Sequence, residues 1–239
     1  MILEGNVSVK AAVLGGMREV YEIIADQNKH DKDTAFILRQ AEQRNIKITR
    51  TDRETIDSMA SGRTHGGLIA AAGARKYQSM EEVIDLKDPF FALVEGVEDP
   101  FNLGYVIRSL YSAGCDALFL DQRNWENAEP VILRSSAGAF EYLNIVMTED
   151  PAAEIRKMKS RGVRTFAAMR KDAIEYFDAP LKRPLLIAIG GEMRGLSAKV
   201  RAEIEQNIYI PYANDFRNAL NASGAASALA FEVMRQNRK

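Results

Sequence analysis

Hydrophobic and polar positions change their period along this chain of 239 residues, and the change predicts alternating helices and strands. In the first 75 residues two runs with helical spacing are each followed by a β-branched run. The expected elements are a helix from Gly5, a strand ending at Ile24, a helix over 35–44, a strand over 46–48, a short helix over 56–59 and the glycine-marked stretch 64–73. This pattern predicts a small α/β unit, large enough to fold alone.

Residues 76–88 carry many charges and few large apolar side chains, so we interpret them as a linker with room for one helical turn. The chain from residue 89 onward then repeats apolar strands and amphipathic helices. The expected strands are 90–95, 117–120, 143–146, 165–168, 185–189 and 208–210, and the expected helices include 131–136 and 152–161. Continuous apolar strands of this kind are typical of a parallel sheet, whose ligands bind beyond the carboxyl ends of its strands.

Composition describes an ordinary soluble protein, with 46% hydrophobic and 27% charged residues and a net charge of -1. No apolar run is long enough for a membrane span, and the first residues lack the pattern of a signal peptide, so we expect a cytoplasmic protein. Cys115 is the only cysteine, which excludes an internal disulfide or a cysteine-based zinc cluster. His30 and His65 stand apart; we interpret His65, beside two glycines, as a turn residue and expect no metal site.

Basic residues gather in the second half of the N-terminal unit, although the net charge gives no general attraction to nucleic acid. They are Arg39, Arg44, Lys47, Arg50 and Arg53. Such a group forms either a solvated surface or a patch that contacts phosphates. The sequence leaves both interpretations open.

Three loops at expected strand ends carry the candidate chemistry. They read FNLGYVIR over 101–108, GGEMRGLS over 190–197 and IPYANDFRNALNASGAASA over 210–228. The second lacks the lysine of a phosphate-binding loop, which argues against nucleotide hydrolysis, and the glycine spacing of a dinucleotide site is absent. The third enters a terminal helix rich in small residues, although glycine costs about 1 kcal/mol there relative to alanine. We infer that something approaches that helix closely.

In this order and spacing, the three stretches resemble the three motifs of the SpoU (TrmH-like) family of RNA ribose methyltransferases. RSSAGAFEYLNI, residues 134–145, resembles the stretch between the first two motifs, and residues 2–72 resemble the small substrate-binding domain that often precedes this catalytic domain. The resemblance implies an RNA-binding α/β domain over 1–75, a linker over 76–88 and an α/β-knot domain over 89–239. It further implies a trefoil knot, a homodimer, S-adenosylmethionine as cofactor and transfer of its methyl group to a ribose 2'-hydroxyl of structured RNA. Ribosomal RNA is the first expected substrate and tRNA the second.

The same resemblance implies roles for individual residues. Arg108 matches the arginine that activates the hydroxyl, and because a guanidinium is a poor base we expect it to orient that hydroxyl and stabilise negative charge. Asn102 and Glu192 would orient the loops or the RNA, and Asn221 would fix the third loop. The cofactor pocket would consist of Ala167, Ala168, Met169, Gly190, Gly191, Gly195, Ile210, Tyr212, Ala219 and Leu220, mostly through backbone groups.

Ala219 departs from the family pattern, which has a serine immediately before the Leu-Asn of the third motif. Loss of that hydroxyl leaves an alternative, in which the protein is a non-catalytic knotted dimer that binds RNA. A third possibility is an α/β protein that binds a metabolite and has no affinity for RNA at low salt.

Overall fold

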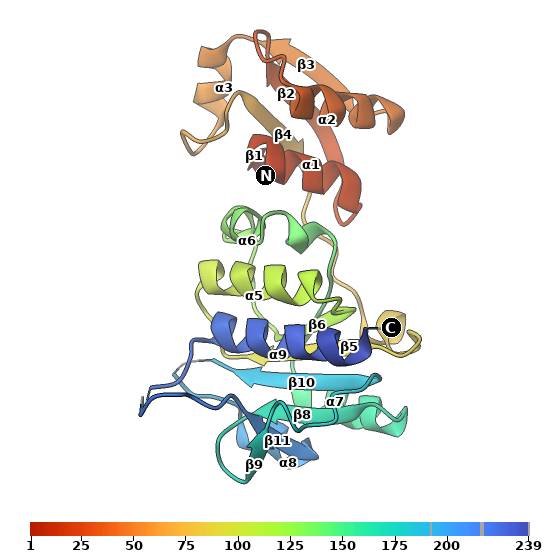
Figure 1. Ribbon diagram of the computed structural model, residues 1–239. Coiled ribbons are helices and arrows are strands. Elements are labelled where there is room, and N and C mark those ends of the chain that lie inside the picture. The colour runs from red at the N-terminus through yellow and green to blue at the C-terminus, as the bar shows by residue number, and fades with distance from the viewer. Residues whose placement is uncertain (192, 216–217, 239) are drawn as a thin grey trace. The chain divides into compact units, whose positions relative to one another are not determined.

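The computed structural model describes residues 1–191, 193–215 and 218–238, and the chain divides into two compact units (Figure 1). The first consists of Met1–Lys76 together with Trp125–Tyr142. The second consists of Tyr77–Asn124 and Leu143–Lys239. The chain therefore leaves the second unit once, adds a short segment to the first, and returns.

A four-stranded sheet organises the first unit, in the order β1-β4-β2-β3. Strands β2 and β3 run parallel, whereas β4 runs antiparallel to β1 and β2. Ile24, Ile56 and Ile69 form a buried cluster beside this sheet. The elements are β1 (Ile2–Glu4), α1 (Gly5–Gly15), β2 (Val20–Asp26), α2 (Lys32–Gln43), β3 (Lys47–Thr51), α3 (Arg53–Met59), β4 (Leu68–Ala72), α6 (Glu129–Ser135) and the 3-10 helix η1 (Ala139–Glu141).

Buried polar contacts hold α6 and η1 within this unit. The guanidinium of Arg18 lies 2.9 Å from Glu129 and 2.7 Å from Glu141, and the three side chains are almost fully buried. Arg75 donates a hydrogen bond of 2.9 Å to the carbonyl of Phe140 and lies over its ring. These contacts satisfy charges that would be costly to bury alone.

The second unit contains a sheet of seven strands in the order β7-β6-β5-β10-β8-β11-β9, and its neighbouring strands pair in parallel. Helices α5 and α9 pack side by side, and α9 contacts β10, whereas α7 contacts β6, β8 and α8 (Figure 1). The elements are α4 (Met80–Val83), β5 (Phe90–Glu95), α5 (Pro100–Ser112), β6 (Ala117–Asp121), β7 (Asn144–Thr148), α7 (Pro151–Ser160), β8 (Arg164–Ala168), β9 (Ala173–Glu175), β10 (Leu185–Gly190), α8 (Ala198–Glu203), β11 (Gln206–Tyr209) and α9 (Ala222–Asn237). The sheet confirms the predicted parallel α/β class.

Short elements were missing from the sequence prediction. Strands β1 and β9 and helix α8 are three to six residues long, which is too short to show a clear period. Helix α1 ends at Gly15 because Gly16 adopts a left-handed conformation with φ 72°. The threading of the chain into a knot stays a prediction. Within the described residues, no helix has the length and apolar character needed to cross a bilayer.

Candidate functional site

A cavity of about 340 Å³, which we call the sheet-edge cavity, lies at the carboxyl ends of β8, β10 and β11. This edge is where ligands of parallel α/β sheets bind. Its wall combines apolar side chains, glycine backbone and two arginines. The lining residues are Ala168, Met169, Arg170, Ile189, Gly190, Gly191, Gly195, Leu196, Arg201, Ile208, Tyr209, Ile210, Tyr212, Ala219, Leu220, Ala222 and Ala225.

The predicted cofactor residues meet in this cavity, although they come from three separate stretches of the chain. Ala168 and Met169 follow β8, the glycines belong to the loop after β10, and the others follow β11. Ala167 does not line the cavity: it is fully buried in the core cluster between the sheet and α7. Its neighbour Met169 donates its backbone N–H to the carbonyl of Ile208, 2.9 Å away, which joins two of the walls.

Close backbone approach shapes the loop that follows β10. A Cβ on Gly190 would lie 2.4 Å from the carbonyl carbon of Gly195, and a Cβ on Gly191 would lie 2.1 Å from the carbonyl oxygen of Gly96. Only glycine fits at these two positions. Glu95 holds both ends of the loop, because its carbonyl accepts from Gly191 at 2.7 Å and its carboxylate accepts from the backbone of Ser197 at 2.6 Å.

Tyr212 closes the other side of the sheet-edge cavity. Its hydroxyl accepts a 2.7 Å hydrogen bond from the backbone of Leu220, which joins the two ends of the 210–221 loop. The guanidinium of Arg170 lies over the Tyr212 ring, 4.7 Å from its centroid. Arg170 and Arg201 therefore place two positive charges beside a mostly apolar wall.

A second cavity, of about 480 Å³, adjoins the first through their shared residue Ala222. We call it the acidic cavity; it is lined by Gly96, Val97, Glu98, Asp99, Asn102, Asp121, Met193, Arg194 and Ala222. Asp121 accepts a 2.8 Å hydrogen bond from the backbone of Gly96. Burial, together with the nearby charge of Glu95, nevertheless raises the pKa of Asp121 above its usual value.

Asn102 and Arg108 both lie on α5 but point in different directions. The helix begins with Asp99, whose side chain accepts from the backbone of Asn102 at 2.7 Å, and with Pro100 in its first turn. Asn102 lines the acidic cavity. Arg108 is exposed, lines neither cavity, and follows Phe101 and Tyr105 at helical spacing along one exposed stripe.

The remaining predicted residues lie at the start of α9. Asn221 is the N-cap of this helix, where its side chain accepts from the backbone of Gly224 at 2.8 Å and from the hydroxyl of Ser223 at 3.2 Å. Ala219, for which the resemblance leads one to expect a serine, lines the sheet-edge cavity. Glu192 lies outside the described residues. Deeper in the helix, the hydroxyls of Ser227 and Ser109 lie 2.6 Å apart, so small side chains let α9 approach α5 closely.

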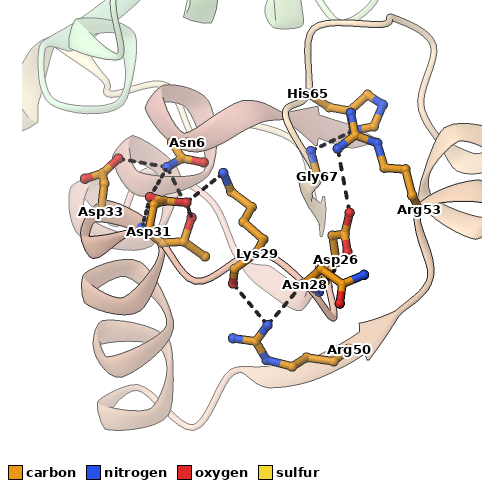
Figure 2. Close-up of polar contacts among 11 residues, drawn as sticks. Asn6, Asp26, Asn28, Lys29, Asp31, Asp33, Arg50, Arg53, His65 and Gly67 are labelled. Carbon is orange, nitrogen blue, oxygen red and sulfur yellow. Dashed lines mark hydrogen bonds and ion pairs between the residues drawn. The ribbon is translucent and has the colours of Figure 1, made fainter.

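Basic side chains of the first unit contact acceptors of that unit (Figure 2). In this view Arg50 donates to the carbonyls of Asp26 and Lys29, at 3.1 and 3.3 Å, and Arg53 lies 3.7 Å from the carboxylate of Asp26. Arg53 also forms an ion pair of 3.0 Å with Asp57. Arg44 bonds to Gln40 and Lys47 pairs with Glu22, whereas Arg39 lies over the ring of Phe36. A phosphate would have to compete with these partners, which weakens the interpretation of the group as a phosphate-binding patch.

His65 lies in a turn, as the sequence predicted. Its Nδ1 accepts from the backbone of Gly67 at 3.2 Å (Figure 2). Its carbonyl accepts from the backbone of Leu68 at 3.1 Å, and its Nε2 lies 3.0 Å from Asp57. With both ring nitrogens engaged and the side chain buried, His65 stabilises the turn. Among the described residues, no group of three or more metal-ligating side chains is close enough to hold an ion.

Sequence reasoning missed Asp121, Arg170 and Arg201, which line the two cavities, and Glu95, which holds the loop after β10. Glu95 and Asp121 carry a signal, because each is a single acidic residue at the end of an apolar strand. Arg170 and Arg201 carry none, since both look like ordinary surface charges until the strand order brings them together.

Family models match both parts of the chain. The SpoU rRNA Methylase family model matches residues 89–231, and a model for RNA 2'-O ribose methyltransferase substrate binding matches residues 2–78. The chain is 28% identical to the 23S rRNA (guanosine-2'-O-)-methyltransferase RlmB of Shewanella oneidensis, over 99% of this chain and 98% of that protein.

Solved structures share the fold. The SpoU methyltransferase AviRb of Streptomyces viridochromogenes, in complex with AdoMet, superposes with a TM-score of 0.81 at 22% identity, covering 99% of this chain and 90% of that one. An AdoMet-bound rRNA methyltransferase from Sinorhizobium meliloti gives a TM-score of 0.80 at 19% identity, covering 100% and 88%.

Proposed function

The chain belongs to the SpoU rRNA methylase family, and we propose that it transfers a methyl group from S-adenosylmethionine to a ribose 2'-hydroxyl of structured RNA. The observation that carries this proposal is the meeting of the second and third motif loops around the sheet-edge cavity. We take ribosomal RNA as the substrate, because the RlmB relative, which acts on 23S rRNA, aligns along the whole chain.

The sheet-edge cavity fits this cofactor. Its volume of about 340 Å³ lies within the range of about 300 to 1,000 Å³ of small-molecule sites. Ile189, Leu196 and Ile208 offer apolar surface to an adenine, and Arg170 and Arg201 offer positive charge to a carboxylate. When bound, the cofactor would supply a methyl group on a sulfonium, so the protein has mainly to position the hydroxyl, whose proton would pass to a phosphate oxygen of the RNA.

Four polar residues named by the motifs have separate roles in the transfer. Because a guanidinium is a poor base, Arg108 orients the 2'-hydroxyl and stabilises the charge that develops on its oxygen. Asn102, in the acidic cavity, orients the ribose. The family resemblance gives Glu192 the role of orienting the loops or the RNA. Asn221 caps α9 and so holds Leu220 and Ala222 in the cavity wall.

Arg108 acts from the partner subunit of a homodimer. The support is its position, since it lies outside both cavities on a stripe with Phe101 and Tyr105, which are 54% and 47% exposed. Exposed aromatic residues of this kind are enriched in protein interfaces. A second copy seated on this stripe would cover the aromatic rings and place Arg108 in the interface.

A transfer assay tests the proposal with S-adenosylmethionine labelled in its methyl group and ribosomal RNA from cells that lack the protein. We expect incorporation at a ribose, its loss in Arg108→Ala, and little recovery in Arg108→Lys, because lysine lacks the planar donor geometry. Cofactor affinity, measured by calorimetry, is expected to stay unchanged in both variants. Cofactor binding without incorporation into any RNA would refute the enzyme.

Ala219 motivates the second candidate, a non-catalytic dimer that binds RNA. Ala219→Ser restores the family's hydroxyl at the cavity wall and separates the two candidates. A catalytic protein should transfer methyl groups before the substitution, and the serine should change its rate. A non-catalytic protein should gain transfer only with the serine, or not at all.

A further inference from the structure

The first unit contains a third cavity, of about 270 Å³, which we call the N-terminal cavity. It lies among β1, the start of α1, the loop after α3 and helix α6, and α6 contacts both α1 and β1. Its lining residues are Ile2, Leu3, Glu4, Ser8, Ser61, Gly62, Asn127, Pro130, Val131, Leu133 and Arg134. None of them belongs to the proposed methyl-transfer site.

Glu4 gives this cavity its chemistry. One carboxylate oxygen, Oε1, accepts hydrogen bonds from the backbone of Ser61 at 2.7 Å and of Gly62 at 3.1 Å. The other oxygen, Oε2, is buried and has no hydrogen-bond partner among the described residues. Leaving such an acceptor without a donor costs about 1 to 3 kcal/mol, and more when it is charged. A ligand with an N–H group would satisfy it.

The guanidinium of Arg134 also lines the N-terminal cavity and supplies hydrogen-bond donors there, but it forms no ion pair with Glu4. A Cβ on Gly62 would lie 2.8 Å from Glu4 Oε2 and 3.7 Å from a terminal nitrogen of Arg134, so both groups face Gly62. They form no ion pair within 4.0 Å in the described part of the chain. The cavity thus offers an acceptor and a set of donors, held apart.

The remaining walls suit a flat ring. Ile2, Pro130 and Val131 supply apolar surface, whereas the Ser8 hydroxyl and the Asn127 amide are polar. The volume is just below the range of about 300 to 1,000 Å³ for drug-sized ligands, which is enough for one heteroaromatic ring system. A nucleobase has this combination of apolar faces and an edge with donors and acceptors.

We propose that the N-terminal cavity binds one unstacked, amino-bearing nucleobase of the RNA substrate, with Glu4 Oε2 accepting from its exocyclic amine. Cytosine, adenine and guanine carry such an amine beside an acceptor for Arg134, and acidic side chains accept from the amine of cytosine. In uracil two carbonyls flank the single ring N–H and repel the carboxylate. This inference rests on the proposed function, because it takes the nucleobase to come from the RNA substrate. Residues 2–78 match a substrate-binding module.

Nuclear magnetic resonance of the full-length protein tests this proposal through the backbone amides of Ser61 and Gly62, which bond to Glu4. CMP, AMP, GMP and UMP are the probes. We expect saturable shifts of both amides with at least one amino-bearing nucleotide, and binding about tenfold weaker for UMP. Substrate RNA should displace the bound nucleotide, because the two share the cavity.

Two variants sharpen the test. Glu4→Gln retains an acceptor for the two amides but loses the charge, and should weaken nucleotide binding about tenfold. Gly62→Ala places a methyl group against Oε2 and should have a similar effect. Glu42→Gln, an exposed acid-to-amide change on α2, is the matched control and should bind as the parent does.

The outcomes separate this proposal from the proposed function. Equal binding of UMP, no effect of Glu4→Gln, or failure of RNA to displace the nucleotide would each overturn it, even in a protein that methylates RNA. In an active protein, Glu4→Gln should raise the KM for RNA and leave kcat and cofactor affinity unchanged. A protein that passes the nucleotide test yet transfers no methyl group would refute only the proposed function.

Discussion

The guanidinium of Arg18 lies 2.7 Å from a carboxylate oxygen of Glu141, and both side chains are fully buried although 123 positions separate them in the chain. Glu129 contacts the same guanidinium at 2.9 Å. Burial acts to lower the pKa of Arg18, but the hydrogen bonds and charges of Glu141 and Glu129 outweigh it and raise that pKa. This cluster joins the segment Trp125–Tyr142 to the first unit.

Arg18→Met should destabilise the protein by about 3 to 5 kcal/mol, because it leaves two buried carboxylates without their counter-charge. Urea unfolding measures the change. Glu129→Gln and Glu141→Gln added to Arg18→Met should restore part of the loss, since they remove the unpaired charges. An unfolding free energy unchanged by Arg18→Met would contradict a structural role for the cluster.

Gly190→Ala should weaken cofactor binding by tenfold or more, equivalent to about 1.4 kcal/mol, because the methyl group overlaps the backbone of Gly195 and shifts the cavity wall. Titration calorimetry with S-adenosylmethionine provides the measurement. Gly73→Ala is the matched control, since its methyl group would press only on the exposed end of Tyr21 and would make an ordinary contact with the carbonyl of Glu19. Unchanged affinity in Gly190→Ala would show that this loop does not form the cofactor site.

If the proposed dimer forms through α5, Tyr105→Glu should convert it to monomers and abolish transfer, because it places a charge in the centre of the exposed stripe on this helix. Sedimentation velocity reports the oligomeric state. Tyr21→Glu changes a similarly exposed tyrosine of the first unit and should leave the dimer intact. A Tyr105→Glu protein that remains dimeric would place the interface elsewhere.

Asp121→Asn should raise the melting temperature at pH 7. The folded state raises the pKa of Asp121 through burial, so its ionised form is less stable in the folded than in the unfolded chain. The stability that the protonated form contributes is complete below the unfolded value of about 3.9 and is lost as the pH rises through the folded value. Asparagine retains an acceptor for Gly96 and does not titrate.

The advantage of Asp121→Asn over the parent should therefore be greater at pH 7 than near pH 3, which thermal unfolding at the two values would show. The exposed change Glu42→Gln controls for the loss of one negative charge. An equal difference at both values would mean that Asp121 titrates alike in the folded and unfolded chains.

The candidate site was predictable in large part because its motifs are continuous in the sequence. Gly190 and Gly191 follow an apolar strand, and Tyr212 follows another, so strand ends could be located and loops assigned to them. Parallel strands place their carboxyl ends at one edge, which is why separate loops were expected to meet there. Family resemblance supplied the roles that spacing alone could not.

Other features depended on which parts of the chain lie together in space. Arg18, Glu129 and Glu141 are ordinary charges in the sequence, and only their burial in one cluster shows that they bind a distant segment to the first unit. Glu95 and Asp121 end two strands, but it is the order β6-β5-β10 that sets them beside the loop after β10. Local pattern determines where helices and strands form, whereas long-range pairing determines which charges become buried neighbours and hence where cavities and functional contacts arise.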